Sequence, residues 1–214
     1  MTALRTIIAA ASAALALAGP ASAVDAEGRF AIEGGGLQTC GDFETAMQWR
    51  TRDVSAYGGW LEGYLTALNQ SYADVYDLTP WQTTESLLSL LRSVCRQMPD
   101  DARVAAGVDR MVAVLLPQAL RDESPVVAVP AADGEAFAMY VAVLDRIGAG
   151  LRSRGHDVVQ RTGHFGEDTR EGLRAVQAAA GLPATGLPDQ RTLFVLLLDA
   201  APRPVAAASP PSGG

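Results

Sequence analysis

The carboxy-terminal stretch GHDVVQRTGHFGEDTREGLRAVQAAAGLPATGLPDQRTLFVLL, residues 155–197, alternates glycine-marked turns with short helical segments. Glu167, Asp168 and Thr169 are typical of a helix start and Gly181 of a helix end, so a short helix is expected between them. A second helix is expected after Asp189, which would cap it. Its apolar residues are Leu193, Phe194, Leu196 and Leu197.

A third helix is expected directly upstream of this stretch. Its apolar residues recur with helical spacing as far as Gly155, which would end the helix in a left-handed conformation. These residues are Phe137, Tyr140, Val141, Leu144, Ile147 and Leu151. The three segments together predict a small all-helical domain over residues 135–200.

The order of the glycine, threonine, glutamine and leucine motifs in this segment resembles that of the small three-helix peptidoglycan-binding domain that many bacterial wall enzymes carry. The resemblance runs from Tyr140 to Asp199 and rests on the pattern G-x-F-G-x-x-T at residues 163–169. A Gln-containing helix, a G-L pair, a T-G pair and a final T-L pair follow it in order. The resemblance implies the three-helix fold and peptidoglycan as the partner. Two positions depart from the family pattern, with Val176 where Phe is usual and His156 where Tyr is common.

Five residues are candidate peptidoglycan contacts under this resemblance. Phe165, His164 and His156 offer rings that could stack on a sugar face, while Arg170 and Gln177 offer hydrogen-bond donors to acetamido or carboxylate groups. Structural roles compete with these assignments. Phe165 is also typical of a core residue, Arg170 of a solvated helix face, and Gln177 of a side chain that braces a loop.

The first part of the chain predicts a helical bundle over residues 38–121. Amphipathic stripes indicate helices over residues 53–72, 87–98 and 104–115, the last opened by Asp100 and Asp101 as caps. Cys40 and Cys95 are the only two cysteines, and Cys95 lies on the apolar face of its helix. An isolated pair in an exported protein is typical of a structural disulfide, so we expect these two to be joined.

This first segment resembles the secreted HdeA-like and effector-immunity helical family. The resemblance rests on Cys40, the pattern Y-x-x-W-L-x-G-Y at residues 57–64, Asn69, the leucine-rich segment 87–91, and Cys95 followed by Pro99. It implies a domain that binds proteins, either by shielding unfolded chains in acid or by blocking cell-wall amidases. Trp81, beside Pro80, is expected to be an exposed anchor for a protein partner.

The remaining segments predict export and flexible connections. Arg5, an apolar run over residues 7–17 and the small residues at 21–23 are typical of a signal peptide over residues 1–23. We therefore expect a periplasmic or secreted protein that has no membrane contact after cleavage. Residues 122–134 are predicted to be a linker, and residues 201–214, rich in Pro, Ala, Ser and Gly, a disordered tail.

Composition excludes several classes of function. The net charge is −7, which disfavours nucleic acid as a partner. All 17 basic residues are Arg, so no lysine nucleophile is available. The two histidines, His156 and His164, lack a metal-binding pattern, and no pair of carboxylates marks a catalytic site. We expect no metal, no cofactor and no catalytic residue, with Glu62 as the one acid worth testing.

The sequence therefore predicts an all-α protein, a disulfide-stapled helical bundle followed by a small three-helix peptidoglycan-binding-like domain. The predicted function is non-enzymatic binding of peptidoglycan by the second domain, with the bundle presented to an envelope protein or wall hydrolase. One alternative is an immunity-type inhibitor of a wall hydrolase, or a periplasmic holdase, with the second domain as a spacer. A second alternative is a wall hydrolase with an unrecognised site.

Overall fold

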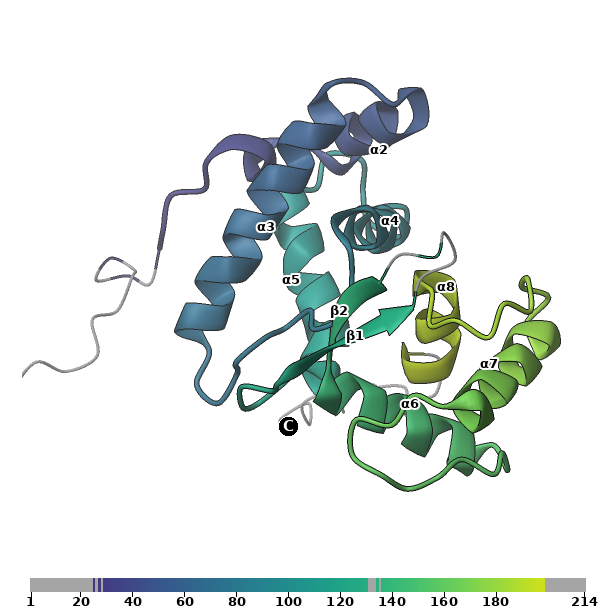
Figure 1. The fold of residues 1–214 in the computed structure, drawn as a ribbon. Coiled ribbons are helices and arrows are strands. Elements are labelled where there is room, and N and C mark those ends of the chain that lie inside the picture. The colour runs from purple at the N-terminus through teal and green to yellow at the C-terminus, as the bar shows by residue number, and fades with distance from the viewer. Residues whose placement is uncertain (1–24, 26, 28, 131–133, 135, 199–214) are drawn as a thin grey trace, which may run out of the picture. The chain divides into compact units, whose positions relative to one another are not determined.

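The computed structural model describes residues 25, 27, 29–130, 134 and 136–198 (Figure 1). The predicted signal peptide 1–23 and the predicted tail 201–214 lie outside the described residues. All described helices and strands belong to the compact unit that begins at Gly34. Within the described part of the chain, no helix combines the length and the apolar character needed to cross a bilayer. The predicted all-α class is confirmed, since only one small sheet accompanies the helices.

A bundle of α-helices forms the first part of this unit (Figure 1). Each helix carries its apolar side chains on one face, and these faces meet in a single buried cluster. Phe43, Leu61, Leu91, Met111 and Leu115 are fully buried in it. The elements are the 3-10 turn η2 (Gly34–Leu37), α2 (Cys40–Trp49), α3 (Asp53–Ser71), α4 (Thr84–Cys95), α5 (Val104–Leu115) and the 3-10 turn η3 (Leu116–Gln118).

The predicted disulfide is confirmed. Cys40 begins α2 and Cys95 ends α4, and the bridge joins them with their Cα atoms 5.2 Å apart. Both residues are buried. Helix α5 packs directly on the bridge through Gly107, where an added Cβ would lie 3.3 Å from the Cys95 sulfur. The cystine is therefore part of the bundle core.

The connection between α4 and α5 differs from the prediction. Helix α4 ends at Cys95, three residues before Met98, and α5 follows Arg103 without a side-chain cap. Asp100, which was expected to cap α5, instead offers its carbonyl to the Gly41 N–H at 2.9 Å. The loop is held against the first turn of α2, a contact that local capping rules do not reveal.

Glu44 of α2 clamps α4 through two arginines. Arg92 donates from Nη2 and Nε to the two carboxylate oxygens of Glu44 at 2.6 and 2.8 Å. Arg96 donates from Nη2 to Glu44 Oε1 at 2.8 Å. The hydrogen bonds from Arg92 and then Arg96 lower the pKa of Glu44 to about 2. This clamp closes the side of the bundle where α2 and α4 meet.

We expect acid to remove this contribution to stability. The folded-state pKa of Glu44 is about 2 and its ordinary value is 4.5, so the stabilisation is complete above pH 4.5 and is lost as the pH falls towards 2. Glu44→Gln should lower the free energy of unfolding at neutral pH by about 1 kcal/mol, because the group is partly exposed. Urea unfolding at several pH values should show this difference shrinking in acid, whereas a constant difference would contradict the assignment.

The predicted linker contains a strand, which is a correction. Strand β1 (Val126–Pro130) pairs antiparallel with β2 (Ala136–Tyr140), so Val127 faces Met139 and Val129 faces Phe137. The predicted upstream helix accordingly begins at Val141 and not near Phe137. Each strand buries one residue, Val129 in β1 and Met139 in β2, and its first three residues are exposed. The run over residues 126–129 lies between two prolines, and this local pattern had predicted a linker instead of a strand.

Three helices follow the hairpin: α6 (Val141–Ser153), α7 (Glu167–Ala179) and α8 (Gln190–Leu193), which continues into the π-helical turn η4 (Phe194–Leu198) (Figure 1). Asp189 caps α8 by accepting from the Thr192 N–H at 3.0 Å, as expected. The apolar faces of the three helices and the inner residues of the hairpin share a second buried cluster. Leu144, Ile147, Leu151, Leu173 and Leu193 are among its largest fully buried side chains.

Candidate functional site

A pocket of about 330 Å³ lies between α6 and the loop that leads to α7. Its helix side is one face of α6, because the contributing positions recur at spacings of three and four residues. The other side is the loop over residues 154–166. The pocket is lined by Leu144, Asp145, Gly148 and Arg152 from α6, and by Val158, Val159, Gln160, Arg161, Thr162 and His164 from the loop.

Two carboxylates hold the loop in place. Asp145 on α6 accepts from the Gly163 N–H at 2.8 Å, and Asp168 on α7 accepts from the Val159 N–H at 2.7 Å. Gly163 has φ of +67°, a conformation that favours glycine over other residues. The loop is thus fastened to both neighbouring helices, and the pocket wall is fixed by backbone hydrogen bonds.

His164 links the loop to the first turn of α7. Its Nε2 lies 2.7 Å from Asp168 Oδ1, and its Nδ1 lies 2.9 Å from Arg161 Nη2. A guanidinium can only donate, so Nδ1 accepts and Nε2 carries the proton that is donated to Asp168. The chain Arg161–His164–Asp168 therefore positions the Arg161 guanidinium at the pocket.

Asp168 is held ionised by these contacts. Its partial burial acts to raise the pKa, but the hydrogen bonds from the Val159 N–H, His164 and the Thr169 N–H outweigh it and lower the pKa to about 2. The carboxylate also lies in the first turn of α7, where a negative charge is favoured by the helix dipole. Asp168 is a positioning residue that orients His164 and the loop.

Arg152 and Arg161 give the pocket its chemical character. Neither guanidinium forms an ion pair with any carboxylate in the described residues. The Arg152 side chain lies over Gly148, where an added Cβ would be 3.2 Å from Nη1. The one carboxylate in the lining, Asp145, is already engaged by Gly163. Two unpaired guanidiniums beside apolar walls suit a ligand that carries a carboxylate.

Of the five predicted contact residues, the lining of this pocket includes His164 alone. Phe165 packs partly buried against the second cluster, with the Arg170 guanidinium carbon 5.4 Å from its ring centre. His156 is half-buried beside Gly172 of α7 and is not one of the residues that line the pocket. Sequence reasoning missed Arg152 and Arg161, for which the one local signal was Gly148 four residues before Arg152.

Gln177 is fully buried, so its amide is not available to a ligand. Its Nε2 lies within 3.2 Å of oxygen atoms on Thr185, Leu187, Asp189 and Thr192. Its Oε1 accepts from the Gly186 N–H at 2.8 Å. These contacts correct the assignment of Gln177 as a ligand donor, because both ends of the amide tie the loop before α8 to α7.

The prediction that Trp81 is an exposed anchor is also wrong. It is only 7% exposed and packs edge-on against Phe194 of η4, with ring centres 5.2 Å apart. Its carbonyl accepts from the Gln190 side chain at 2.6 Å. The loop that carries Trp81 is drawn onto the second cluster by this apolar contact, so the ring is not an exposed anchor. The exposed tryptophan is Trp49 at the end of α2, with 72% of its surface accessible.

Comparison with known proteins identified a similar family for the segment that contains most of the lining residues. Residues 147–196 match the family model described as "Putative peptidoglycan binding domain". The match supports a peptidoglycan-binding-like domain in this part of the chain and peptidoglycan as its partner. Searches of the curated proteins and of the solved structures found no match. The matched residues lie outside segment 38–121, whose HdeA-like resemblance stays a prediction.

Proposed function

We propose that this protein is exported, to the periplasm or beyond, and binds peptidoglycan through the pocket that Arg152 and Arg161 line, without catalysing a reaction. The bundle over residues 38–121 is then presented at the wall. The observation that supports this most directly is the pair of guanidiniums without carboxylate partners, within the segment that matches the peptidoglycan-binding family.

The chemistry of the pocket suits the peptide part of peptidoglycan. Stem peptides end in carboxylates, and a guanidinium binds a carboxylate through two parallel hydrogen bonds. Leu144 and Val158 supply apolar contact for a small side chain next to that group. The Asp145 carboxylate, held by Gly163, limits how close a second negative charge can approach. The proposal therefore places a terminal carboxylate between the two arginines.

Co-sedimentation of the full mature chain with purified sacculi tests this proposal. We expect Arg152→Gln and Arg161→Gln each to lower the bound fraction at least fivefold at low salt, since each loses a charge-assisted hydrogen bond. Added NaCl should weaken wild-type retention, because the pocket is open to solvent. Arg191→Gln on α8 is the matched control, since it removes the same charge from an exposed residue outside the pocket.

The same experiment separates the alternatives. Retention of the Arg152→Gln and Arg161→Gln variants at the wild-type level would overturn the pocket assignment, and loss of wild-type retention would overturn peptidoglycan binding itself. An inhibitor or holdase with the second domain as a spacer predicts no retention at all. Trp81 was expected to be an exposed anchor of the protein-binding bundle under both readings, and its burial supports neither of them.

A further inference from the structure

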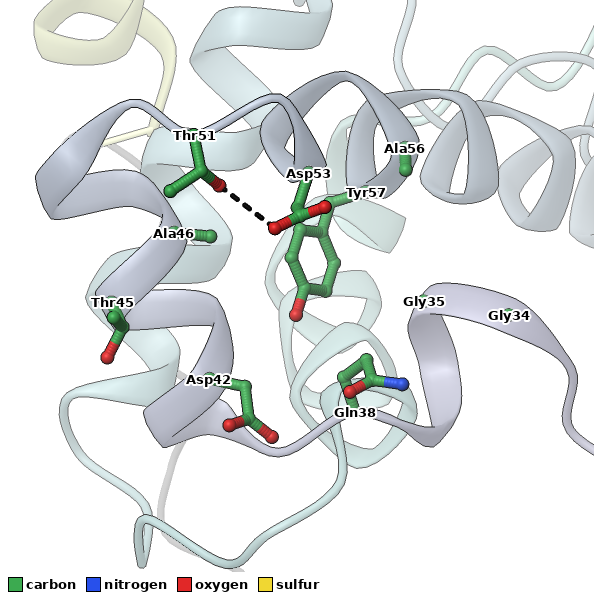
Figure 2. A pocket seen from close by; sticks show the side chains of 10 residues that line it. All are labelled: Gly34, Gly35, Gln38, Asp42, Thr45, Ala46, Thr51, Asp53, Ala56 and Tyr57. Atoms are coloured by element: carbon green, nitrogen blue, oxygen red, sulfur yellow. Dashed lines mark hydrogen bonds between the residues drawn. The ribbon is translucent and has the colours of Figure 1, made fainter.

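A second and larger pocket lies in the bundle, at the junction of η2, α2 and α3 (Figure 2). Its volume is about 640 Å³. Figure 2 shows polar side chains from α2, from α3 and from the turn between them around this space, with Gln38 next to η2, while η2 itself contributes two glycines. The lining residues are Gly34, Gly35, Gln38, Asp42, Thr45, Ala46, Thr51, Asp53, Ala56 and Tyr57.

Tyr57 gives this pocket an unused hydrogen-bonding group. The side chain is only 6% exposed, and its ring packs edge-on against Phe43 with centres 5.0 Å apart. Its hydroxyl points into the pocket, towards the space between Asp42 and Gln38 (Figure 2). The only hydrogen bond that Figure 2 marks between the lining residues joins Thr51 to Asp53, so Tyr57 has no partner among them. The hydroxyl oxygen is not one of the buried polar atoms that lack a partner, so it faces the open pocket and is available to a ligand.

The charges around the Tyr57 hydroxyl are all negative. Asp42 and Asp53 both line the pocket, and no arginine or histidine does. The Thr39 hydroxyl and N–H hydrogen-bond to Asp42 and lower its pKa, so this carboxylate stays ionised. Burial raises the pKa of Tyr57, and the charges of Asp42 and Asp53 raise it further. The pocket is an anionic site in which a neutral phenol can donate or accept one hydrogen bond.

We propose that this pocket binds a primary ammonium group on a short aliphatic stem, held by the Asp42 and Asp53 carboxylates and the Tyr57 hydroxyl. An ammonium carries N–H donors and no acceptor, which suits a pocket whose charged lining groups are carboxylates. The methylene stem would lie along Ala46, Ala56 and the Tyr57 ring, which are its apolar walls. An anionic ligand is disfavoured because no cation lines the pocket to offset the two carboxylates.

No side chain of this protein carries an ammonium on an aliphatic stem. The chain contains no lysine, so no side chain of a second copy can supply it. The two sources that carry this chemistry are a free aliphatic diamine and the side chain of a lysine-type residue in a peptide. The site lies outside residues 147–196 and does not depend on the proposed peptidoglycan pocket. The two proposals can therefore fail separately.

Titration of the full mature chain, followed by backbone NMR shifts and calorimetry, tests the site. The probes are 1,5-diaminopentane, N-acetyl-lysine methylamide and the uncharged N-acetyl-norleucine methylamide. We expect both amines to shift the signals of Thr51, Asp53 and Tyr57, and the norleucine compound to leave them in place. Binding of the diamine alone would assign the site to free diamines, and binding of the lysine compound alone would assign it to a peptide side chain. Either result supports an ammonium site.

Two variants identify the groups that bind. Tyr57→Phe keeps the ring packing and should weaken amine binding at least fivefold, because it removes one charge-assisted hydrogen bond. Asp53→Asn should weaken binding about tenfold, since it removes a charge as well. Asp122→Asn is the matched control, as an exposed carboxylate outside the pocket, and should bind like the wild type.

Thermal unfolding distinguishes the loss of a ligand contact from a general loss of stability in the variant. Tyr57→Phe should melt at the wild-type temperature or above it, because its hydroxyl has no hydrogen-bond partner among the described residues. The proposal is overturned if neither amine binds, if the norleucine compound binds equally well, or if the Tyr57→Phe and Asp53→Asn variants bind amines like the Asp122→Asn control.

Discussion

Replacing Cys40 and Cys95 together by alanine is expected to lower the free energy of unfolding by about 4 kcal/mol. The bridge closes a loop of 55 residues, and such a crosslink removes a large part of the conformational freedom of the unfolded chain. It is also buried between α2, α4 and Gly107 of α5, so its loss leaves a gap in the core. Denaturant unfolding of the oxidised wild type and of the double variant measures the difference.

Reductant provides the control for this experiment. Wild-type protein unfolded in the presence of a strong thiol should approach the stability of the double variant, because its crosslink is also lost. The double variant should be insensitive to the thiol, since the chain has no other cysteine. A double variant within 1 kcal/mol of the oxidised wild type would show that the bridge is not a major source of stability.

Gln177→Leu is expected to lower the free energy of unfolding by about 3 kcal/mol, although leucine has a similar volume and is more apolar. The variant leaves the Gly186 N–H, buried in the wild type, without its acceptor, and each such orphaned group costs about 1–3 kcal/mol. The buried Thr192 hydroxyl loses a hydrogen bond as well. The loop before α8 should then detach from α7, which hydrogen exchange of the Gly186 and Leu187 amides would report.

Gln97→Leu is the matched control for the same chemical change. Gln97 is exposed and makes a single side-chain hydrogen bond, to the Ser93 carbonyl at 2.9 Å. Its substitution should alter stability by less than about 0.5 kcal/mol. If the two variants unfold alike, the Gln177 network does not brace the second cluster, and the side chain could be assigned to a ligand again.

The helices could be predicted from sequence where one apolar stripe decides the structure. The periodicity over residues 53–72 predicted α3 to within one residue, and the Asp189 cap of α8 was read correctly. The hairpin was missed because its residues satisfy two patterns at once. Phe137 and Tyr140 continue the helical spacing of α6, yet the same segment forms a strand because Val126–Pro130 pairs with it. Strand pairing is a contact between segments, which a local pattern does not contain.

The candidate site was predicted only in part, for a related reason. His164 was recognised because it belongs to a local motif. Arg152 and Arg161 line one pocket only because the loop over residues 154–166 folds back on α6. Tyr57 was interpreted as part of an apolar stripe, and its ring does pack in the core. Its hydroxyl became a candidate ligand group only because η2 and α2 stop short of it and leave a pocket.

The sequence by itself determined the helical class, the cystine and the resemblance to a peptidoglycan-binding domain, because periodicity, cysteine count and turn residues are properties of neighbouring positions. The tertiary structure decided which polar groups are free to act. In the folded protein, Gln177 and Trp81 are buried. Arg152 and Arg161 line one pocket and Tyr57 lines another. Availability depends on whether a distant segment supplies a partner or covers the group, and only the folded chain brings such segments together.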